Sequence, residues 1–334
     1  MPMNDTQTRW RFIAISSSFV VGLSLMGIKF YAYRVTGSSA ILSDALESII
    51  NVVASGFALW SIYLASQPPD MSHPYGHGKI EYFSAGFEGA LIMLAAGGIF
   101  YTGIPRLLHP RALPNLQQGL FLILSTSLVN LLLGMVLIRV GKRTRSLTLT
   151  ADGKHVLTDV YTTLGVLLGL LLALFTGWYW LDGGVACAVA VNIIISGGKL
   201  VRESFAGLMN ESDPTLLEEI SGILADHRKD HWIDIHKLRA WRSGNRVHLD
   251  FHLILPRELR LDESHHEVKE LENIFQTRFE GMADVLIHVD PCTNGDCPIC
   301  GHNPCILREQ PTSHQRLWHR DQVTAEKDHS QTTA

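Results

Sequence analysis

The chain has 334 residues, of which 46% are hydrophobic and only 18% are charged. Its formal net charge of −4, without any run of lysine or arginine, does not indicate nucleic-acid binding. Nearly all long apolar runs precede Leu208, which excludes a single soluble domain. We expect a helical membrane domain over residues 1–207, a soluble domain over residues 208–292, and a cysteine-containing, mostly disordered tail over residues 293–334.

Six apolar segments are long enough to cross a bilayer as helices, for which about 20 residues are needed. They are Trp10–Tyr33, Ser39–Ala65, Glu81–Leu107, Leu116–Val140, Leu147–Thr176 and Trp178–Val201. The first is too long for the core of a signal peptide, so we expect it to remain as a span. Basic residues cluster between the fourth and fifth segments, and the positive-inside rule therefore places this loop and both termini in the cytoplasm. They are Arg139, Lys142, Arg143 and Arg145.

Two of these segments carry polar residues at helical spacing. His155 and Asp159 are four residues apart and share one helix face, and Glu47 and Asn51 repeat that spacing. An ionisable group in a membrane helix costs about 2.5–3.5 kcal/mol on insertion scales, so it usually faces a partner or a cavity. Two helices that each offer two oxygen or nitrogen ligands can enclose a tetrahedral divalent cation. The pattern predicts a metal-transport site.

The loop after the second apolar segment is a second candidate site. Its prolines and glycines exclude a continuous helix. Asp70, His73 and His77 offer ligands that suit a metal such as zinc. The alternative is a solvated turn whose histidines bind nothing.

After Glu211 the pattern becomes that of a small α/β domain. Apolar periodicity predicts a helix, two alternating strands, a second helix and a third strand. These elements are Leu216–Asp226, Trp232–Trp241, Arg246–Leu255, Leu261–Phe279 and Val285–Val289. This order predicts a small sheet covered on one face by helices.

This soluble domain is rich in candidate ligands. A lone strand histidine is more often a solvated side chain, but five groups from separate elements favour a metal site. They are His236, His252, His265, His288 and Asp290. The four cysteines that follow, with Gly and Pro turns, are typical of a zinc knuckle, and the alternatives are a thiol relay or plain surface thiols. They are Cys292, Cys297, Cys300 and Cys305.

These motifs together resemble the cation diffusion facilitator family, proton-coupled exporters of divalent metals. The resemblance covers about Trp10–Cys292 and is to bacterial members of the zinc/iron type, similar to ferrous-iron efflux proteins. It is carried by four stretches, namely Ser38–Ala45, Pro74–Lys79, His155-x-x-x-Asp159 and Ile287–Pro291. It implies a homodimer with a six-helix membrane domain and a ferredoxin-like cytoplasmic domain, placed in the bacterial inner membrane.

Carried over by position, the resemblance assigns three ligand sets. The transport site is Glu47, Asn51, His155 and Asp159; the loop site is Asp70, His73 and His77; the binuclear site at the dimer interface is His236, His252, His265, His288 and Asp290. Lys79 matches a lysine that pairs with an acidic group near the hinge, and Glu211 is the candidate partner.

The chain departs from the family pattern at two places. Bacterial zinc/iron exporters usually carry aspartates where this chain has Glu47 and Asn51. Asn51 removes one charge, and its amide oxygen is a weaker zinc ligand than a carboxylate or an imidazole, which leaves metal selectivity open. The segment Cys292–Cys305 lies outside the family's core.

The function expected from these residues is proton-coupled export of divalent transition metals, zinc first, with iron, cobalt, nickel, manganese and cadmium as alternatives. No ATP-binding Gly-x-x-x-x-Gly-Lys-Ser/Thr motif is present, which favours the proton gradient as energy source. We expect protons, metal ions and lipid as partners and no prosthetic group. A membrane metalloenzyme is disfavoured because the near match His266–Glu270 lacks the second histidine of His-Glu-x-x-His. The remaining alternative, which Asn51 favours, is a metal sensor or scaffold that does not transport.

Overall fold

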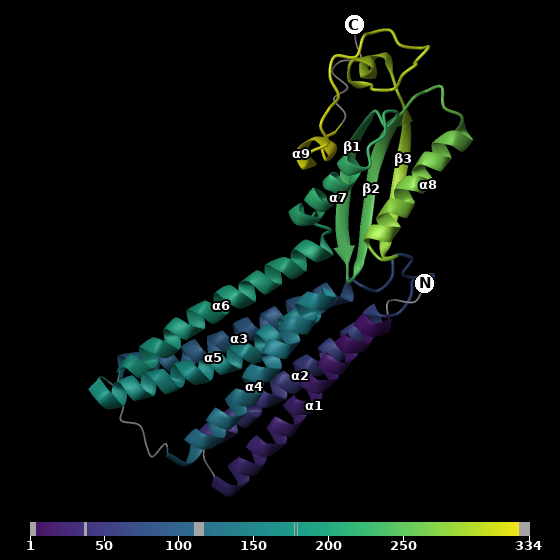
Figure 1. The fold of residues 1–334 in the computed structure, drawn as a ribbon. Helices are drawn as coiled ribbons and strands as arrows, with labels where there is room; N and C mark the ends of the chain where they lie inside the picture. The colour runs from purple at the N-terminus through teal and green to yellow at the C-terminus, as the bar shows by residue number, and fades with distance from the viewer. Residues whose placement is uncertain (1–4, 37–38, 110–116, 177, 179, 327–334) are drawn as a thin grey trace. The chain divides into compact units, whose positions relative to one another are not determined.

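The computed structural model describes residues 5–36, 39–109, 117–176, 178 and 180–326. The chain forms two compact units that divide between Met209 and Asn210. The first unit is a bundle of long helices, and the second contains a three-stranded sheet (Figure 1).

Six long helices make up the described part of the first unit, as the apolar segments predicted. They are α1 (Asp5–Thr36), α2 (Ser39–Ala65), α3 (Ile80–Leu108), α4 (Gln117–Thr144), α5 (Leu147–Thr176) and α6 (Trp180–Leu208). Within the described residues, three stretches are long and apolar enough to cross a membrane by themselves, namely Thr6–Tyr31, Ile80–Pro105 and Ser125–Thr144. These stretches carry large apolar side chains that are exposed on the protein surface, such as Val20 and Leu94. Exposed apolar side chains of this kind suit a lipid environment.

Helices α3 and α6 cross at very short range. A Cβ atom added at Gly89 would lie 2.9 Å from the carbonyl oxygen of Gly197, and one added at Gly197 would lie 3.0 Å from that of Gly89. Small residues allow such backbone contact between membrane helices. The side chain of Glu88, next to this crossing, is completely buried.

A buried ion pair ties three regions of the bundle together. Arg11 on α1 places Nη1 2.8 Å from Oε1 of Glu81 on α3, and both side chains are at most 5% exposed. Arg11 also donates to the backbone carbonyl of Thr144, at the end of α4, and the Ser146 hydroxyl donates to Glu81. The pair therefore links α1 and α3 to the connection between α4 and α5.

The second unit has the predicted order of elements. These are α7 (Pro214–Asp226), β1 (Asp234–Ser243), β2 (Arg246–Leu255), α8 (Leu261–Arg278) and β3 (Ala283–Pro291). Strand β2 is central, pairs antiparallel with β1 and parallel with β3, and α8 makes the crossover between β2 and β3. This small helix-covered sheet is consistent with the predicted ferredoxin-like class.

Strand alternation separates the two faces of the sheet. On one face, Val247, Leu249 and Phe251 of β2 pack into a core with residues of both helices, including Leu216 of α7 and Phe275 of α8. The other face of β2 carries the polar series His248, Asp250 and His252. The candidate ligands of the domain therefore lie away from its apolar core.

Strand β1 contains a bulge close to the ligands. Its pairing with β2 gains one residue between His236 and Arg239, where Lys237 has a positive φ of 54°. The extra residue lets His236 stay on the polar face while Leu238 and Ala240 are buried in the core. The bulge thus reconciles the ligand with the core pattern.

The segment after Cys292 corrects one expectation. Residues 293–334 were predicted to be mostly disordered, but the described part contains η1 (Asn294–Ile299) and α9 (Arg320–Val323). Trp318 and Val323 join the core of the domain, with 4% and 0% exposure. The Lys237 amide in the bulge donates to the carbonyl of Ala325 at 2.9 Å. Isolated apolar anchors, Trp318 and Val323 here and Ile299 in a second cluster, hold this segment on the domain, and they produce no periodicity that a sequence could reveal.

Candidate metal-transport and metal-binding sites

The predicted transport site assembles between α2 and α5. Nε2 of His155 lies 2.9 Å from Oδ1 of Asn51, and the Asn51 amide donates to Oδ2 of Asp159. His155 and Asp159 lie one turn apart on α5, so both reach the same residue of α2. Glu47 lies one turn before Asn51 in α2, but its side chain is outside the described residues. The described ligands form a continuous polar contact inside the bundle.

Two more carboxylates that the sequence analysis did not select adjoin these ligands. Asp152 on α5 is 1% exposed, and its Oδ2 accepts a hydrogen bond of 2.6 Å from Ser18 on α1. Glu88 on α3 is 0% exposed, with Oε2 3.8 Å from Nδ1 of His155. An isolated carboxylate inside an apolar span was the available signal for both residues.

A small cavity lies beside this cluster. It has a free volume of about 20 Å³, enough for one water molecule, and its lining includes Asn51, Asp159, Asp152 and Ser18. Its walls carry amide, carboxylate and hydroxyl oxygens, which are ligand types for a divalent cation.

The loop residues Asp70, His73 and His77 lie together. Oδ1 and Oδ2 of Asp70 lie 3.2 Å from Nδ1 of His73 and 3.3 Å from Nε2 of His77, and the two imidazole nitrogens are 3.1 Å apart. The backbone amide of His73 donates to Asp70 and, as the main cause, lowers the pKa of this carboxyl. Gly76, with a φ of +83°, provides the turn that brings His77 back to Asp70. The three potential ligand atoms lie within 4.8 Å of one another.

Strand register brings together a cluster in the second unit, called here the cytoplasmic group, which consists of His236, His252, His288 and Asp290. His236, His252 and His288 are direct partners across β1, β2 and β3, with ring centroids 4.8 and 4.6 Å apart. Asp290 connects them: Oδ2 lies 2.8 Å from Nδ1 of His252 and 3.5 Å from Nε2 of His236, and Oδ1 lies 3.2 Å from Nε2 of His288. His236, His252 and Asp290 place ligand atoms within 4.8 Å of one another.

Other polar residues of the domain do not join this group. His265 is exposed on α8 and is not part of it. His248, on the same sheet face, stacks on Trp241 and pairs with Asp284 at 3.0 Å, while Asp250 pairs with Arg239. In the membrane unit, Nζ of Lys79 lies 3.5 Å from the carbonyl oxygen of Leu208, and its pairing with Glu211 stays a prediction.

The four cysteines of the predicted zinc knuckle are free thiols, and the structure does not assemble them. Among the described residues, two groups place three potential ligand atoms within 4.8 Å of one another, and neither contains a cysteine. Cys300 instead packs against Ile233, Ile254 and Ile299. Burial, as the main cause, raises the pKa of Cys292. The four-thiol site Cys292, Cys297, Cys300 and Cys305 stays a prediction.

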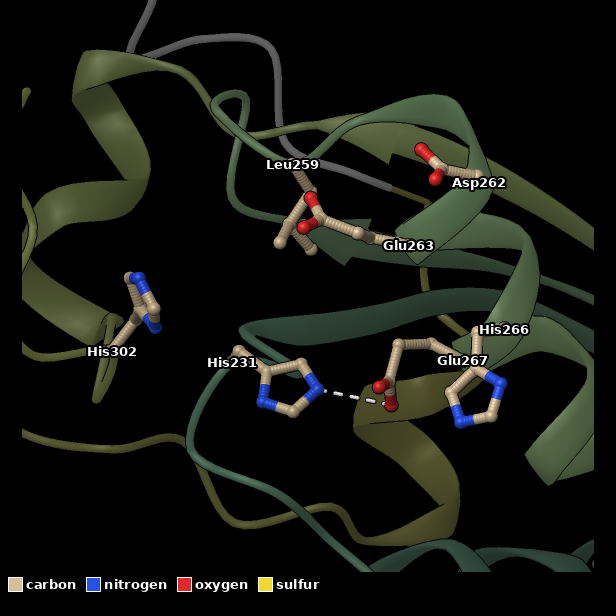
Figure 2. Close-up of a pocket in the computed structure, with 7 residues that line it drawn as sticks. All are labelled: His231, Leu259, Asp262, Glu263, His266, Glu267 and His302. Carbon is tan, nitrogen blue, oxygen red and sulfur yellow. Dashed lines mark ion pairs between the residues drawn. The ribbon is translucent and has the colours of Figure 1, made fainter.

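A separate pocket of about 480 Å³ lies at the start of α8. Figure 2 shows its lining, with His231 directed at Glu267 and His302 on the far side; the other lining residues are Leu259, Asp262, Glu263 and His266. Burial disfavours the charged form of Glu267, but hydrogen bonds from Lys229, His231 and Trp232 outweigh it and lower the pKa of Glu267 to about 2. Glu267 is thus an ionised, well-partnered wall of the pocket rather than a catalytic base.

Comparison with known proteins identifies the whole arrangement. Residues 15–209 match the family model of the cation efflux transmembrane domain, and residues 213–292 match that of the cytoplasmic domain of cation efflux proteins. The chain belongs to the cation diffusion facilitator family. Each matched region lies within one of the two units of the structure.

Several bacterial relatives cover most of this cation diffusion facilitator. An uncharacterised transporter of Synechocystis is 37% identical over 275 residues, which are 82% of this chain and 88% of the relative. The cation-efflux pump FieF of Shewanella oneidensis is 31% identical over 84% of this chain and 94% of its own length. The manganese efflux system protein MneP of Bacillus subtilis is 30% identical over 82% of this chain and 94% of its own length.

Family membership establishes the general role. The chain is an integral membrane transporter of the cation efflux type and not an enzyme. Membership of this family also supports metal cations as the substrates and a homodimer as the assembly. The cytoplasmic match ends at residue 292, so three of the four clustered cysteines lie outside both matched domains.

Proposed function

We propose that this chain exports divalent transition-metal cations from the cytoplasm in exchange for protons, with zinc as the first choice. The observation that carries the proposal is the contact of buried His155 with partly buried Asn51 and Asp159 between α2 and α5. Glu47, one helical turn from Asn51, supplies the fourth ligand. Charged and polar groups buried in a membrane bundle mark ion pathways.

The chemistry of these ligands supports exchange of a metal for protons. A metal binds the deprotonated forms of imidazole and carboxylate, so its arrival releases protons and a high proton concentration displaces it. Imidazole changes charge near neutral pH, which suits His155 to this exchange. Rocking of the helices would expose the site first to the cytoplasm and then to the outside. The basic loop at Lys142 and Arg143 supports cytoplasmic termini in a bacterial inner membrane.

The ligand types support zinc but leave other metals open. Imidazole and carboxylate ligands are the usual partners of zinc. The amide oxygen of Asn51 is a harder, neutral ligand, and oxygen ligands also suit manganese. Iron, cobalt, nickel and cadmium complete the set to be tested, and two relatives are named for cation and manganese efflux.

The two other ligand groups support regulation by the transported metal. We propose that His236, His252, His288 and Asp290 bind cytoplasmic metal, and that His265 contributes at the dimer interface. Metal bound there would tighten the dimer and favour transport, which is an allosteric coupling between two sites. Asp70, His73 and His77 form the additional loop site of this proposal.

The deciding experiment is metal uptake into proteoliposomes under an imposed pH gradient. The intact chain, Asp159→Ala and the matched control Asp226→Ala, at the exposed end of α7, would be compared over zinc, iron, cobalt, nickel, manganese and cadmium. We expect gradient-dependent flux of a subset of these ions, lost in Asp159→Ala and retained in the control.

Two results would contradict the proposal. Unchanged flux in Asp159→Ala would show that the transport site is elsewhere. Metal binding without flux in the intact chain would instead favour a sensor or scaffold, with Asn51 as the residue that disables transport.

A further inference from the structure

We propose that Glu88 is a positioning residue of the transport site, whose carboxylate holds the His155 ring and supplies a negative charge that Asn51 does not. This inference rests on the proposed function, because it concerns the same metal site. It adds α3 to the two helices that contribute ligands.

The geometry places Glu88 on the far side of the imidazole from the other ligands. Nε2 of His155 lies 2.9 Å from Oδ1 of Asn51, whereas Nδ1 of the same ring lies 3.8 Å from Oε2 of Glu88. A metal ligand histidine commonly directs its second ring nitrogen at a carboxylate, which orients the ring and increases its basicity. His155 has this arrangement, because Nε2 faces the proposed ligand Asn51 and Nδ1 faces the Glu88 carboxylate.

The burial of Glu88 requires an explanation of this kind. Neither of its oxygens has a hydrogen-bond partner within the described part of the chain, and Nδ1 of His155 has none either. A carboxylate without a partner is costly in an apolar interior, and such groups in membrane spans mark functional sites. The close crossing of α3 and α6 at Gly89 and Gly197 holds Glu88 inside the bundle instead of in lipid.

Metal binding gives the Glu88 carboxylate a proton donor. Without metal, the contact between Nε2 and Oδ1 requires the neutral His155 ring to carry its proton on Nε2. A metal bound at Nε2 would replace this proton, and the neutral ring would then carry its single proton on Nδ1, where it faces Glu88. A small closing movement of the 3.8 Å contact then forms the hydrogen bond, while Oδ1 of Asn51 is released to the metal.

The charge balance points in the same direction. Asn51 contributes a neutral amide, and Asp159 contributes one carboxylate to the described ligands. The Asp152 carboxylate is engaged by the Ser18 hydroxyl. Glu88 places a carboxylate oxygen 3.8 Å from Nδ1 of His155, and electrostatic attraction to a doubly charged ion acts strongly in this water-poor interior.

The test compares Glu88→Gln with Glu203→Gln, a matched change on α6 at a side chain that is 51% exposed. Metal affinity would be measured by calorimetry and Co²⁺ absorption on the full chain, and flux in proteoliposomes. Each variant would also carry Asp290→Ala, which removes the cytoplasmic group from the signal. We expect Glu88→Gln to weaken affinity on the order of 10- to 100-fold and to shift the Co²⁺ bands, with Glu203→Gln unchanged.

A double-mutant cycle separates positioning from a general structural role. If Glu88 acts through the imidazole, adding Glu88→Gln to His155→Ala will have little further effect on affinity. An equal loss in both backgrounds, or unchanged affinity in Glu88→Gln, would overturn the proposal. Glu88→Asp keeps the charge at a shorter reach and should recover part of the affinity, which provides a second folded variant.

The outcomes remain distinct from those of the proposed function. If the intact chain binds metal but shows no flux, the effect of Glu88→Gln on metal affinity still tests the role of Glu88. If Asp159→Ala leaves both binding and flux unchanged, the transport site itself is wrong, and the proposal for Glu88 falls with it.

Discussion

The bundle and the sheet domain hold the same ligand chemistry in opposite ways. In the bundle, His155 is 3% exposed and its contacts come from two other helices, α2 and α3. In the sheet domain, His252 and Asp290 are about one quarter exposed, and register alone aligns the ligands across adjacent strands. Under the proposed function, the difference follows from the roles of the two sites: a transported ion needs a site sheltered from bulk water, whereas a regulatory ion needs one that the solvent can reach.

The two units also differ in how they retain charged groups. The bundle buries the pair Arg11–Glu81 at 2.8 Å, whereas charges of the sheet domain, such as Arg239 and Asp250, pair at a partly exposed surface. Buried pairs are costly to break, because the remaining charge loses its partner, and exposed pairs contribute little. Four changes of decreasing effect test this contrast.

Breaking the buried pair should have the largest effect on stability. Arg11→Met leaves Glu81 without its partner in the bundle, and we expect a loss of about 3–5 kcal/mol in the free energy of unfolding. Denaturant titration of the detergent-solubilised chain measures it. The control is Lys154→Met, which removes a pair 3.7 Å long with side chains 34% and 51% exposed, and it should cost about 0–1 kcal/mol. Equal losses in both variants would contradict the contrast.

Removing the carboxylate that joins the cytoplasmic histidines should separate binding from transport. Asp290→Ala removes the carboxylate oxygen that contacts both His252 and His236. We expect the affinity of the sheet domain for metal to fall about 100-fold, the upper end of the range seen for residues around metals. Transport should fall only about 5-fold, at the lower end of allosteric coupling. Equilibrium dialysis and proteoliposome flux measure the two quantities. The control Asp284→Asn, on the same sheet face, should leave both unchanged, and complete loss of flux in Asp290→Ala would place this group in the transport path.

Acid should weaken the sheet domain through Glu267. Its pKa is lowered from 4.5 to about 2, so its partnered, ionised form contributes stability in full above pH 4.5. This contribution declines as the pH falls and is lost near pH 2. The unfolding free energy of the full chain, measured between pH 5 and pH 2, should show a slope that Glu267→Gln reduces. An identical slope in the variant would refute the assignment.

Changing a single tail thiol should have the smallest effect. Cys305 lies outside both matched domains and outside the assembled ligand groups. Cys305→Ser should therefore change the metal flux by less than roughly two-fold, which corresponds to about 0.5 kcal/mol. Metal analysis of the purified chain is the second measurement. Loss of one bound ion in Cys305→Ser would instead establish the predicted zinc knuckle, with Cys292, Cys297 and Cys300 as its other ligands.

Local patterns predicted much of the architecture. The apolar runs indicated α1–α6, and alternation indicated β2 with both of its ends, Arg246 and Leu255. The four-residue spacing of His155 and Asp159 placed both on one face of α5, because the helical period is local. The tail was predicted wrongly, since Trp318 and Val323 are anchored by distant partners and not by neighbours in the chain.

The sequence by itself determined the elements and the ligand types, because hydrophobic period, turn residues and side-chain chemistry act over a few residues. Tertiary structure alone decided which ligands meet. The approach of Glu88 to His155 depends on how α3 packs, and the alignment of His236, His252 and His288 depends on strand register and on the bulge at Lys237. These contacts join residues that are far apart in the chain, and only the packing of whole elements determines their distances.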